Sequence, residues 1–171
     1  MSKLPIITLP DPLLRQASKP IETIDADVKR LANDMFETMY VAPGIGLAAV
    51  QVGVPRQMLV LDVADDDETP RPITMINPQI LESSSEMRTH EEGCLSIPDF
   101  KLDIDRPDWV RVSYLDLDGK LQELRTGGLL ATAIQHEIDH LRGKLIIDFL
   151  SRLKRDIVIR RFKKQSRDAT S

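Results

Sequence analysis

Three segments of the chain carry apolar residues at the spacing of an amphipathic helix. The first covers residues 28–39 and is ended by Pro43-Gly44. The second runs from Leu129 to Leu141 and is closed by Gly143, and the third runs from Leu150 to Lys164 among many basic residues. The pattern therefore predicts an N-terminal, a central and a C-terminal helix.

Between the first two helices, short apolar runs and alternating residues predict β-strands. The strand candidates are residues 58–63, 73–81, 110–114 and 121–124. Asp118-Gly119 separates the last two and predicts a hairpin with a two-residue turn, whereas the acidic segment 65–70 predicts a solvated loop. Strands interrupted by well-separated helices favour an α+β fold with mostly antiparallel sheets over a doubly wound parallel sheet.

Length and composition indicate one globular domain over residues 1–171. With 42% hydrophobic residues the chain can bury a core, and its single cysteine, Cys94, excludes an intramolecular disulfide. No apolar stretch is long enough for a signal peptide or a membrane span. We therefore expect a cytoplasmic protein with no membrane partner.

Residues 151–171 differ in charge from the rest of the chain. They carry eight Lys/Arg against two Asp, which leaves the other 150 residues at a net charge of −10. One interpretation is a solvated helix that packs Leu153, Ile157 and Phe162 on the body. The other is a contact with RNA, whose affinity falls steeply with salt. DNA is not an expected partner.

The central helix carries the pattern H-E-x-x-H. Because residues four apart project from the same helix face, His136 and His140 can each place one nitrogen about 2.0–2.1 Å from a common ion. Glu137 then lies beside the ion, where a carboxylate can take a proton from water. The alternative is a surface helix that carries these residues by chance.

A catalytic metal site needs a third protein ligand, and the candidates are Cys94 and His90. Cys94 follows Gly93 in a glycine-containing turn, where the backbone can approach an ion closely. An isolated cysteine is more often a small buried residue, but the histidine pair reverses that preference. His90 precedes two acidic residues on a stretch that we expect to be exposed, so Cys94 is favoured.

Residues 44–51, Gly-Ile-Gly-Leu-Ala-Ala-Val-Gln, combine small residues with a single amide side chain. A phosphate-binding loop is disfavoured because no Lys-Ser/Thr pair follows and a third glycine is lacking. A tight turn into a buried segment is the plain structural interpretation. Beside a metal, however, the amide of Gln51 would stabilise an oxyanion.

Together, residues 44–51, 92–96 and 135–141 resemble the three signature motifs of the peptide deformylases, in order and in spacing. The resemblance extends from Pro10 to Leu145, and it implies antiparallel sheets packed around a central metal-binding helix. It also implies hydrolysis of the N-formyl group from the starting methionine of new polypeptides, with release of formate.

The resemblance assigns a role to each motif residue. The implied metal ligands are Cys94, His136 and His140. Glu137 would act as general acid and base while water activated by the ion attacks the formyl carbon, and Gln51 and the backbone N–H of Leu95 would hold the oxyanion. The implied cofactor is one divalent ion per chain, Fe(II) by resemblance, with nickel, cobalt or zinc also accepted by relatives.

The substrate implied by the resemblance is an N-formylmethionyl peptide. The residues placed along it are Ile45, Gly46, Leu47, Glu92, Leu129 and Ala133. The first three would offer a strand edge to the peptide backbone, and the last three would surround the methionine side chain. Asp139 is expected to face away from the ion.

This chain departs from the family pattern at three positions. Thr132 replaces a larger apolar residue, Lys101 stands near the usual position of an arginine, and His90 is unusual before the acidic pair. These departures predict a more polar or roomier pocket and altered peptide preference.

Two rival functions remain beside deformylation. One is a small metallopeptidase built on the same helix, which Cys94 disfavours, and the other is a non-catalytic relative, which Glu137 and Gln51 disfavour. In resembling proteins the C-terminal helix can contact the ribosome, so a ribosome contact through residues 151–171 is a hypothesis that stands beside the packing interpretation. A bacterial, organellar or phage source is compatible with the sequence.

Overall fold

The computed structural model describes residues 2–64 and 68–170, so part of the predicted acidic loop 65–70 lies outside the described residues. The α-helices are α1 (Ala26–Val41), α2 (Gly128–Leu141) and α3 (Arg152–Thr170), and the short 3-10 helices are η1 (Pro12–Arg15), η2 (Ala49–Val52) and η3 (Ile146–Phe149). The strands are β1 (Gly46–Ala48), β2 (Met58–Leu61), β3 (Ile73–Ser83), β4 (Met87–Cys94), β5 (Ile97–Pro107), β6 (Trp109–Leu115) and β7 (Leu121–Gly127). The α+β class is confirmed.

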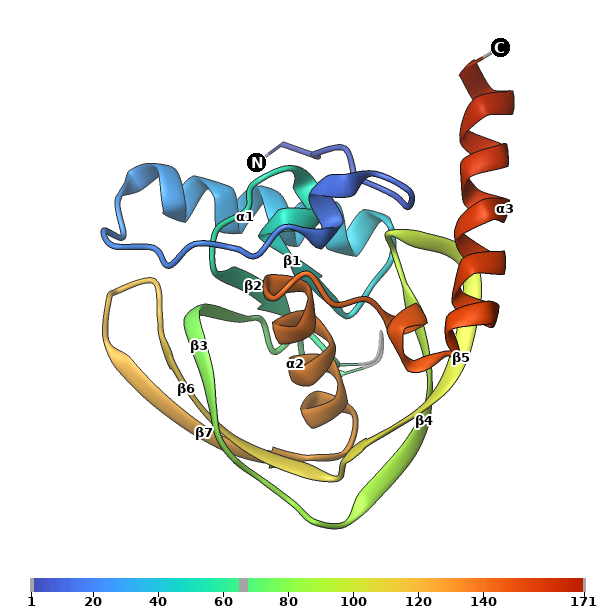
Figure 1. The fold of residues 1–171 in the computed structure, drawn as a ribbon. Helices are drawn as coiled ribbons and strands as arrows, with labels where there is room; N and C mark the ends of the chain where they lie inside the picture. The colour runs from blue at the N-terminus through green and yellow to red at the C-terminus, as the bar shows by residue number, and fades with distance from the viewer. Residues whose placement is uncertain (1, 65–67, 171) are drawn as a thin grey trace.

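The sheets of the described residues are antiparallel throughout. Five strands pair in the order β1-β2-β3-β6-β7, and β4 and β5 form a separate two-stranded sheet. Figure 1 shows α2 lying between the two sheets, in the middle of the molecule. The predicted arrangement of antiparallel sheets around a central helix is therefore confirmed.

The predicted N-terminal helix is confirmed as α1. The Asp25 side chain caps it by accepting a hydrogen bond from the Val28 N–H at 3.0 Å. Its buried face packs with strands β1 and β2 in one apolar cluster, which contains Ile21, Val28, Ala32, Met35, Met39, Leu47, Ala49, Met58, Val60 and Ile76. This packing orders the segment that leads from α1 into β1.

The predicted hairpin is confirmed as β6 and β7, but its turn is longer than two residues. Residues 116–120 connect the strands, and the Asp116 carboxylate accepts hydrogen bonds from the Asp118 and Lys120 N–H groups. Gly119 takes the left-handed backbone conformation, with φ +78°. The aspartate side chain thus stabilises a wider loop than the Asp-Gly pair alone predicts.

The hairpin of β4 and β5 was not predicted from the sequence. Residues on the inward face of β4 are partly or fully buried in alternation with exposed ones, and they are Arg88, His90, Glu92 and Cys94. Because all four are polar or small, the strand lacks the apolar alternation that usually reveals one. The interpretation of residues 92–96 as a turn holds only for Leu95 and Ser96.

Helix α2 is buried on both sides. Its apolar face packs against the five-stranded sheet through Ala131, Ile134, Ile138 and Leu141. It ends at Leu141, and Gly143 follows its C-cap with φ +75°; an added Cβ at Gly143 would lie 2.3 Å from the Arg15 carbonyl oxygen. The glycine is required there because both the backbone conformation and the space exclude a side chain.

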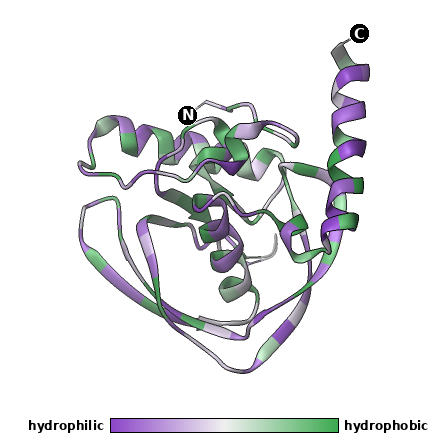
Figure 2. Cartoon of the chain, in the orientation of Figure 1, coloured by the Kyte–Doolittle hydropathy of each residue, from purple (hydrophilic) through white to green (hydrophobic). Residues whose placement is uncertain are grey.

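Helix α3 begins two residues later than predicted and continues to Thr170. Its Phe162 is buried with Ile97 and Ile104 of β5. Contrary to the packing interpretation from the sequence, Leu153 and Ile157 are 69% and 55% exposed. Hydrophilic residues dominate the turns of α3 nearest the C-terminus in Figure 2. No helix in the described part of the chain has the length and apolar character needed to cross a membrane.

Candidate active site

Three potential metal ligands converge between β4 and α2. Cys94 ends β4, and His136 and His140 lie one turn apart on α2. One donor atom from each residue lies within 4.8 Å of the others, and Cys94 Sγ is 3.3 Å from His140 Nε2. Donors bound tetrahedrally at about 2.0–2.3 Å lie roughly 3.3–3.6 Å apart, so the group has room for one ion. Cys94 is thus the third member of this cluster, called the donor group below, and His90 is not a member.

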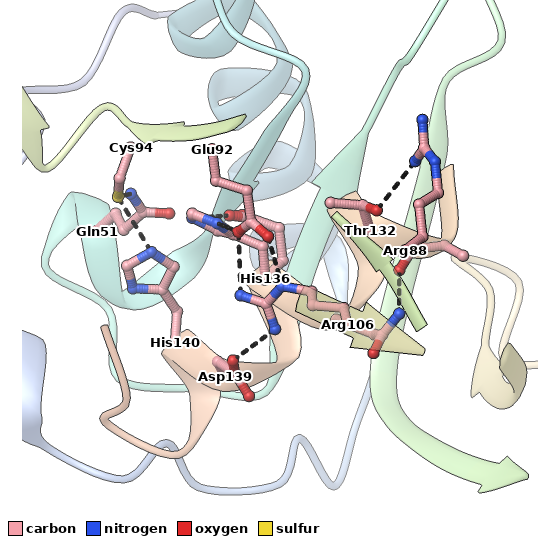
Figure 3. A network of polar contacts seen from close by, with 12 residues as sticks. Gln51, Arg88, Glu92, Cys94, Arg106, Thr132, His136, Asp139 and His140 are labelled. Atoms are coloured by element: carbon pink, nitrogen blue, oxygen red, sulfur yellow. Dashed lines mark hydrogen bonds and ion pairs between the residues drawn. The ribbon is translucent and has the colours of Figure 1, made fainter. Parts of the chain in front are cut away.

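A buried carboxylate orients His136. Its Nδ1 lies 2.9 Å from Glu92 Oε1, which leaves Nε2 directed toward the other donors. Figure 3 shows Glu92 between His136 and Arg106, whose guanidinium donates to both Glu92 oxygens at 2.6 and 3.0 Å. A carboxylate on the second ring nitrogen fixes the tautomer of a metal-binding histidine and raises its basicity.

Arg106 was not identified from the sequence. It is 5% exposed, and it also donates to Asp139 Oδ2 at 2.9 Å, so Asp139 contacts the arginine and not the donor group, as predicted. The sequence feature that could have identified it is the alternation in β5, where Leu102, Ile104 and Arg106 stand at every second position. An arginine at an inward position of a strand indicates a buried carboxylate partner.

Glu137 lies beside the donor group. Its Oε1 is 3.6 Å from His136 Nε2, and its Oε2 has no hydrogen-bond partner among the residues that the structure describes. Burial raises the pKa of Glu137 to about 7, although the charges of His136 and Arg106 act in the opposite direction. A carboxylate with a pKa near neutrality is suited to take and return a proton.

The two histidines respond differently to their surroundings. Burial and the nearby charge of His136 hold the pKa of His140 well below its usual value, so His140 remains neutral and able to bind a cation. Burial also disfavours charge on His136, but Glu137, Cys94 and Glu92 outweigh it and raise the pKa of His136 well above its usual value. The carboxylates of Glu92 and Glu137 would also favour a divalent cation bound at His136.

Gln51 is fully buried and held in one orientation. Its Oε1 accepts a hydrogen bond from the Ala48 N–H at 2.9 Å, and its Nε2 donates to Ser96 Oγ at 3.0 Å. The same Nε2 lies 3.7 Å from Cys94 Sγ. The amide therefore presents its N–H side to the donor group, as Figure 3 shows.

A cleft of about 840 Å³ opens on the donor group. Of the residues expected along the substrate, those that line it are Ile45, Gly46, Glu92, Leu129 and Ala133, and Leu95 and Gln51 line it as well. Leu47 is fully buried in the apolar core, so only its backbone is available at β1. β1 is an edge strand that pairs with β2 on one side, which leaves its other edge available for hydrogen bonding.

A glycine is needed at position 46 because a side chain there would collide with Glu137. A Cβ at Gly46 would lie 3.0 Å from Glu137 Cγ and 3.2 Å from Glu137 Cδ. A Cβ at Gly44 would similarly meet Leu95 Cδ1 at 2.9 Å. Gly44 therefore lets the segment before β1 approach the second motif, and Gly46 lets β1 approach the helix of the third motif.

A partly buried group of three donors, a neighbouring buried carboxylate and a cleft are the features of a metal-dependent hydrolase. The sequence profile of the polypeptide deformylases matches residues 3–156. The chain is 60% identical over 164 residues to a peptide deformylase of Mesorhizobium japonicum, covering 96% of this chain and 93% of that one. It is also 58% identical over 167 residues to a peptide deformylase of Rhizobium meliloti, covering 98% and 96%.

Solved structures give the same result. A peptide deformylase from Ehrlichia chaffeensis in complex with actinonin superposes with a TM-score of 0.92 at 43% identity, covering 98% of this chain and 99% of that chain. One from Legionella pneumophila has a TM-score of 0.89 at 43% identity, covering 99% and 98%. The chain belongs to the peptide deformylase family, the hydrolases that remove the N-formyl group from nascent peptides.

Proposed function

We propose that deformylation by this chain uses a single divalent ion bound by Cys94, His136 and His140, with Glu137 as the general acid and base. The observation that carries the proposal is the partly buried group of three donors with the buried Glu137 carboxylate beside it, on the wall of the cleft. The ion, which we propose to be Fe(II), would supply an activated water and polarise the formyl carbonyl when bound.

The protein residues account for the proton transfers and the developing charge. Glu137 takes the proton of the attacking water and returns it to the amine that leaves the formyl carbon. Gln51 Nε2 and the backbone N–H of Leu95 donate hydrogen bonds to the oxyanion of the tetrahedral intermediate. Gln51 suits this role because its own carbonyl is held by Ala48, so the amide does not have to reorganise.

The substrate of the proposal is an N-formylmethionyl peptide. Its backbone would add to the free edge of β1 along Ile45, Gly46 and Leu47, which requires main-chain hydrogen bonds alone. Its first side chain would enter the cleft between Leu129 and Ala133 of α2, near Glu92. Main-chain recognition explains how one enzyme can process peptides of many sequences.

We propose that α3 contacts ribosomal RNA in the cytoplasm. Leu153 and Ile157 are exposed, and they stand among the basic residues of the helix. Such a contact would combine apolar burial with phosphate neutralisation and would weaken as salt rises. Ribosome co-sedimentation that persists after removal of residues 151–171 would refute this contact.

The catalytic proposal is tested by comparing two peptides that differ in the formyl group. Anaerobically prepared, iron-loaded enzyme should release formate from a formyl-Met peptide and leave the internal bonds of the unformylated peptide intact. Cleavage of an internal bond without formate release would instead identify a metallopeptidase. The apoenzyme serves as the control, and it should release no formate.

A further inference from the structure

Beyond the donor group, polar pairs between β4 and α2 continue along the cleft. Thr132, His136 and His140 are spaced four residues apart and share one face of α2. Opposite them, Cys94 lies 3.3 Å from His140, Glu92 lies 2.9 Å from His136, and Arg88 Nη1 donates to Thr132 Oγ1 at 3.3 Å. Figure 3 shows the Arg88 and Thr132 pair on the far side of His136 from Cys94.

The Thr132 hydroxyl retains an unused donor. It accepts the hydrogen bond from Arg88, and the structure gives its own hydrogen no acceptor within residues 2–64 and 68–170. A hydroxyl can donate one hydrogen bond while it accepts another. Thr132 is 5% exposed and lines the cleft, so an acceptor within the cleft is the partner available to it.

His90 adds a second polar group to the same wall. It also lines the cleft, and its place on β4 alternates with exposed residues in phase with Glu92 and Cys94. A histidine ring always carries at least one N–H donor. The cleft wall next to Leu129 and Ala133 is therefore partly polar, although these two apolar residues line it as well.

We propose that this wall lets the enzyme deformylate peptides whose first methionine has been oxidised to the sulfoxide, with Thr132 as the specificity-determining residue. The proposal rests on the proposed function. Thr132 lies four residues from His136, about 6 Å along the helix axis, a distance that an unbranched methionine side chain can span. Oxidation turns the thioether of methionine into a chiral, polar S=O acceptor. Methionine sulfoxide is therefore a polar first residue that arises from the starting methionine itself.

The test compares three formylated peptides that differ in the first side chain: methionine, methionine sulfoxide as separated epimers, and norleucine. The wild-type enzyme should process one sulfoxide epimer with a kcat/KM within about tenfold of the methionine peptide, and the other epimer more slowly. In Thr132→Val, which keeps the shape and removes the hydroxyl, the ratio of sulfoxide to methionine kcat/KM should fall about 3- to 10-fold. The epimer preference should decrease with it.

Two further variants separate the hydroxyl from general effects. Thr89→Val makes the same change on the outer face of β4, where the threonine hydroxyl contacts Asp105 outside the cleft, and it should leave the ratio as in wild type. His90→Leu should lower the ratio in the same direction as Thr132→Val. Norleucine hydrolysis by each variant shows that the protein is folded and loaded with metal.

The outcomes distinguish this inference from the function on which it rests. Absence of formate from the methionine peptide would overturn the proposed function itself. Hydrolysis of the methionine peptide, with a sulfoxide ratio equal in wild type and Thr132→Val, would overturn the role of Thr132 alone. A wild-type kcat/KM that is more than about 100-fold lower for both sulfoxide epimers than for the methionine peptide would overturn the sulfoxide proposal as a whole and leave the proposed function standing.

Discussion

Helices α2 and α3 both carry many polar residues, but they place them in opposite environments. In α2, Glu137 and His140 are 3% and 1% exposed, and His136 is held by a buried glutamate. In α3, the basic residues are mostly exposed, and the turns near the C-terminus are the most hydrophilic part of the helix in Figure 2. The comparison shows that a buried polar residue needs a defined hydrogen-bond or ion-pair partner, and that such partners fix its orientation and protonation for chemistry.

The difference arises from what packs against each helix. The five-stranded sheet covers the apolar face of α2, and the hairpin of β4 and β5 covers its polar face with Glu92, Cys94 and Arg106. The part of α3 that packs on the protein is centred on Phe162. Substitutions in α2 and its partners should therefore have far larger effects than substitutions in α3.

The largest effect is expected at Glu137. Replacing Glu137 with Ala removes the group that transfers the proton, and kcat should fall by about 10²- to 10⁴-fold. Formate release from a formyl-Met peptide measures the change, with metal content as the control. Activity within a few-fold of wild type would refute the assignment of Glu137.

The next largest effect is expected at Arg106. Arg106→Met removes the cation shared by Glu92 and Asp139. The buried Glu92 carboxylate then keeps His136 as its side-chain partner but loses the compensating positive charge, which should lower the free energy of unfolding by roughly 3–5 kcal/mol. Urea unfolding measures this difference. The matched control is Arg111→Met, where a partly exposed arginine pairs with the more exposed Glu123 on the neighbouring strand and where no measurable change is expected. An equal decrease in the free energy of unfolding of the two variants would contradict the claim that the buried ion pair contributes more than the exposed one.

A smaller, pH-dependent effect is expected at Asp148, which joins the start of the chain to η3. Partial burial acts to raise its pKa, but two hydrogen bonds from Arg15 hold the pKa of Asp148 below its usual value of 3.8. A lowered folded-state pKa stabilises the protein above pH 4 and loses that effect as the pH falls through the folded-state pKa. The difference in unfolding free energy between wild type and Asp148→Asn should be about 1 kcal/mol at pH 7 and should shrink below pH 3.8. A difference that stays constant over this range would contradict the ion pair.

The smallest effect is expected on α3. Because Ile157 is exposed, Ile157→Ser should change the unfolding free energy by less than about 0.5 kcal/mol and leave formate release unchanged. If the proposed ribosome contact is correct, the same variant should weaken co-sedimentation with ribosomes. Thermal unfolding and sedimentation check the two effects separately. A large loss of stability would show that this face of α3 packs on the protein.

The same comparison explains how much could be predicted from the sequence. The helix of His136 and His140 was predictable because its apolar face has a clear period and Gly143 ends it. The hairpin of β4 and β5 was not, because polar groups occupy the inward positions of β4 and hide its alternation from hydropathy. Arg106 was missed for a different reason: its carboxylate partners lie 14 and 33 residues away in the sequence, so no local pattern links them.

The most direct test of the metal site compares the metal content of three anaerobically purified proteins. Wild type and Glu137→Ala should each contain one divalent ion per chain, because Glu137 lies beside the donor group and is not part of it. Cys94→Ala should lose most of the ion, since it removes one of three ligands. Full metal content in Cys94→Ala, or loss of the ion from Glu137→Ala, would contradict the assignment of ligands and base.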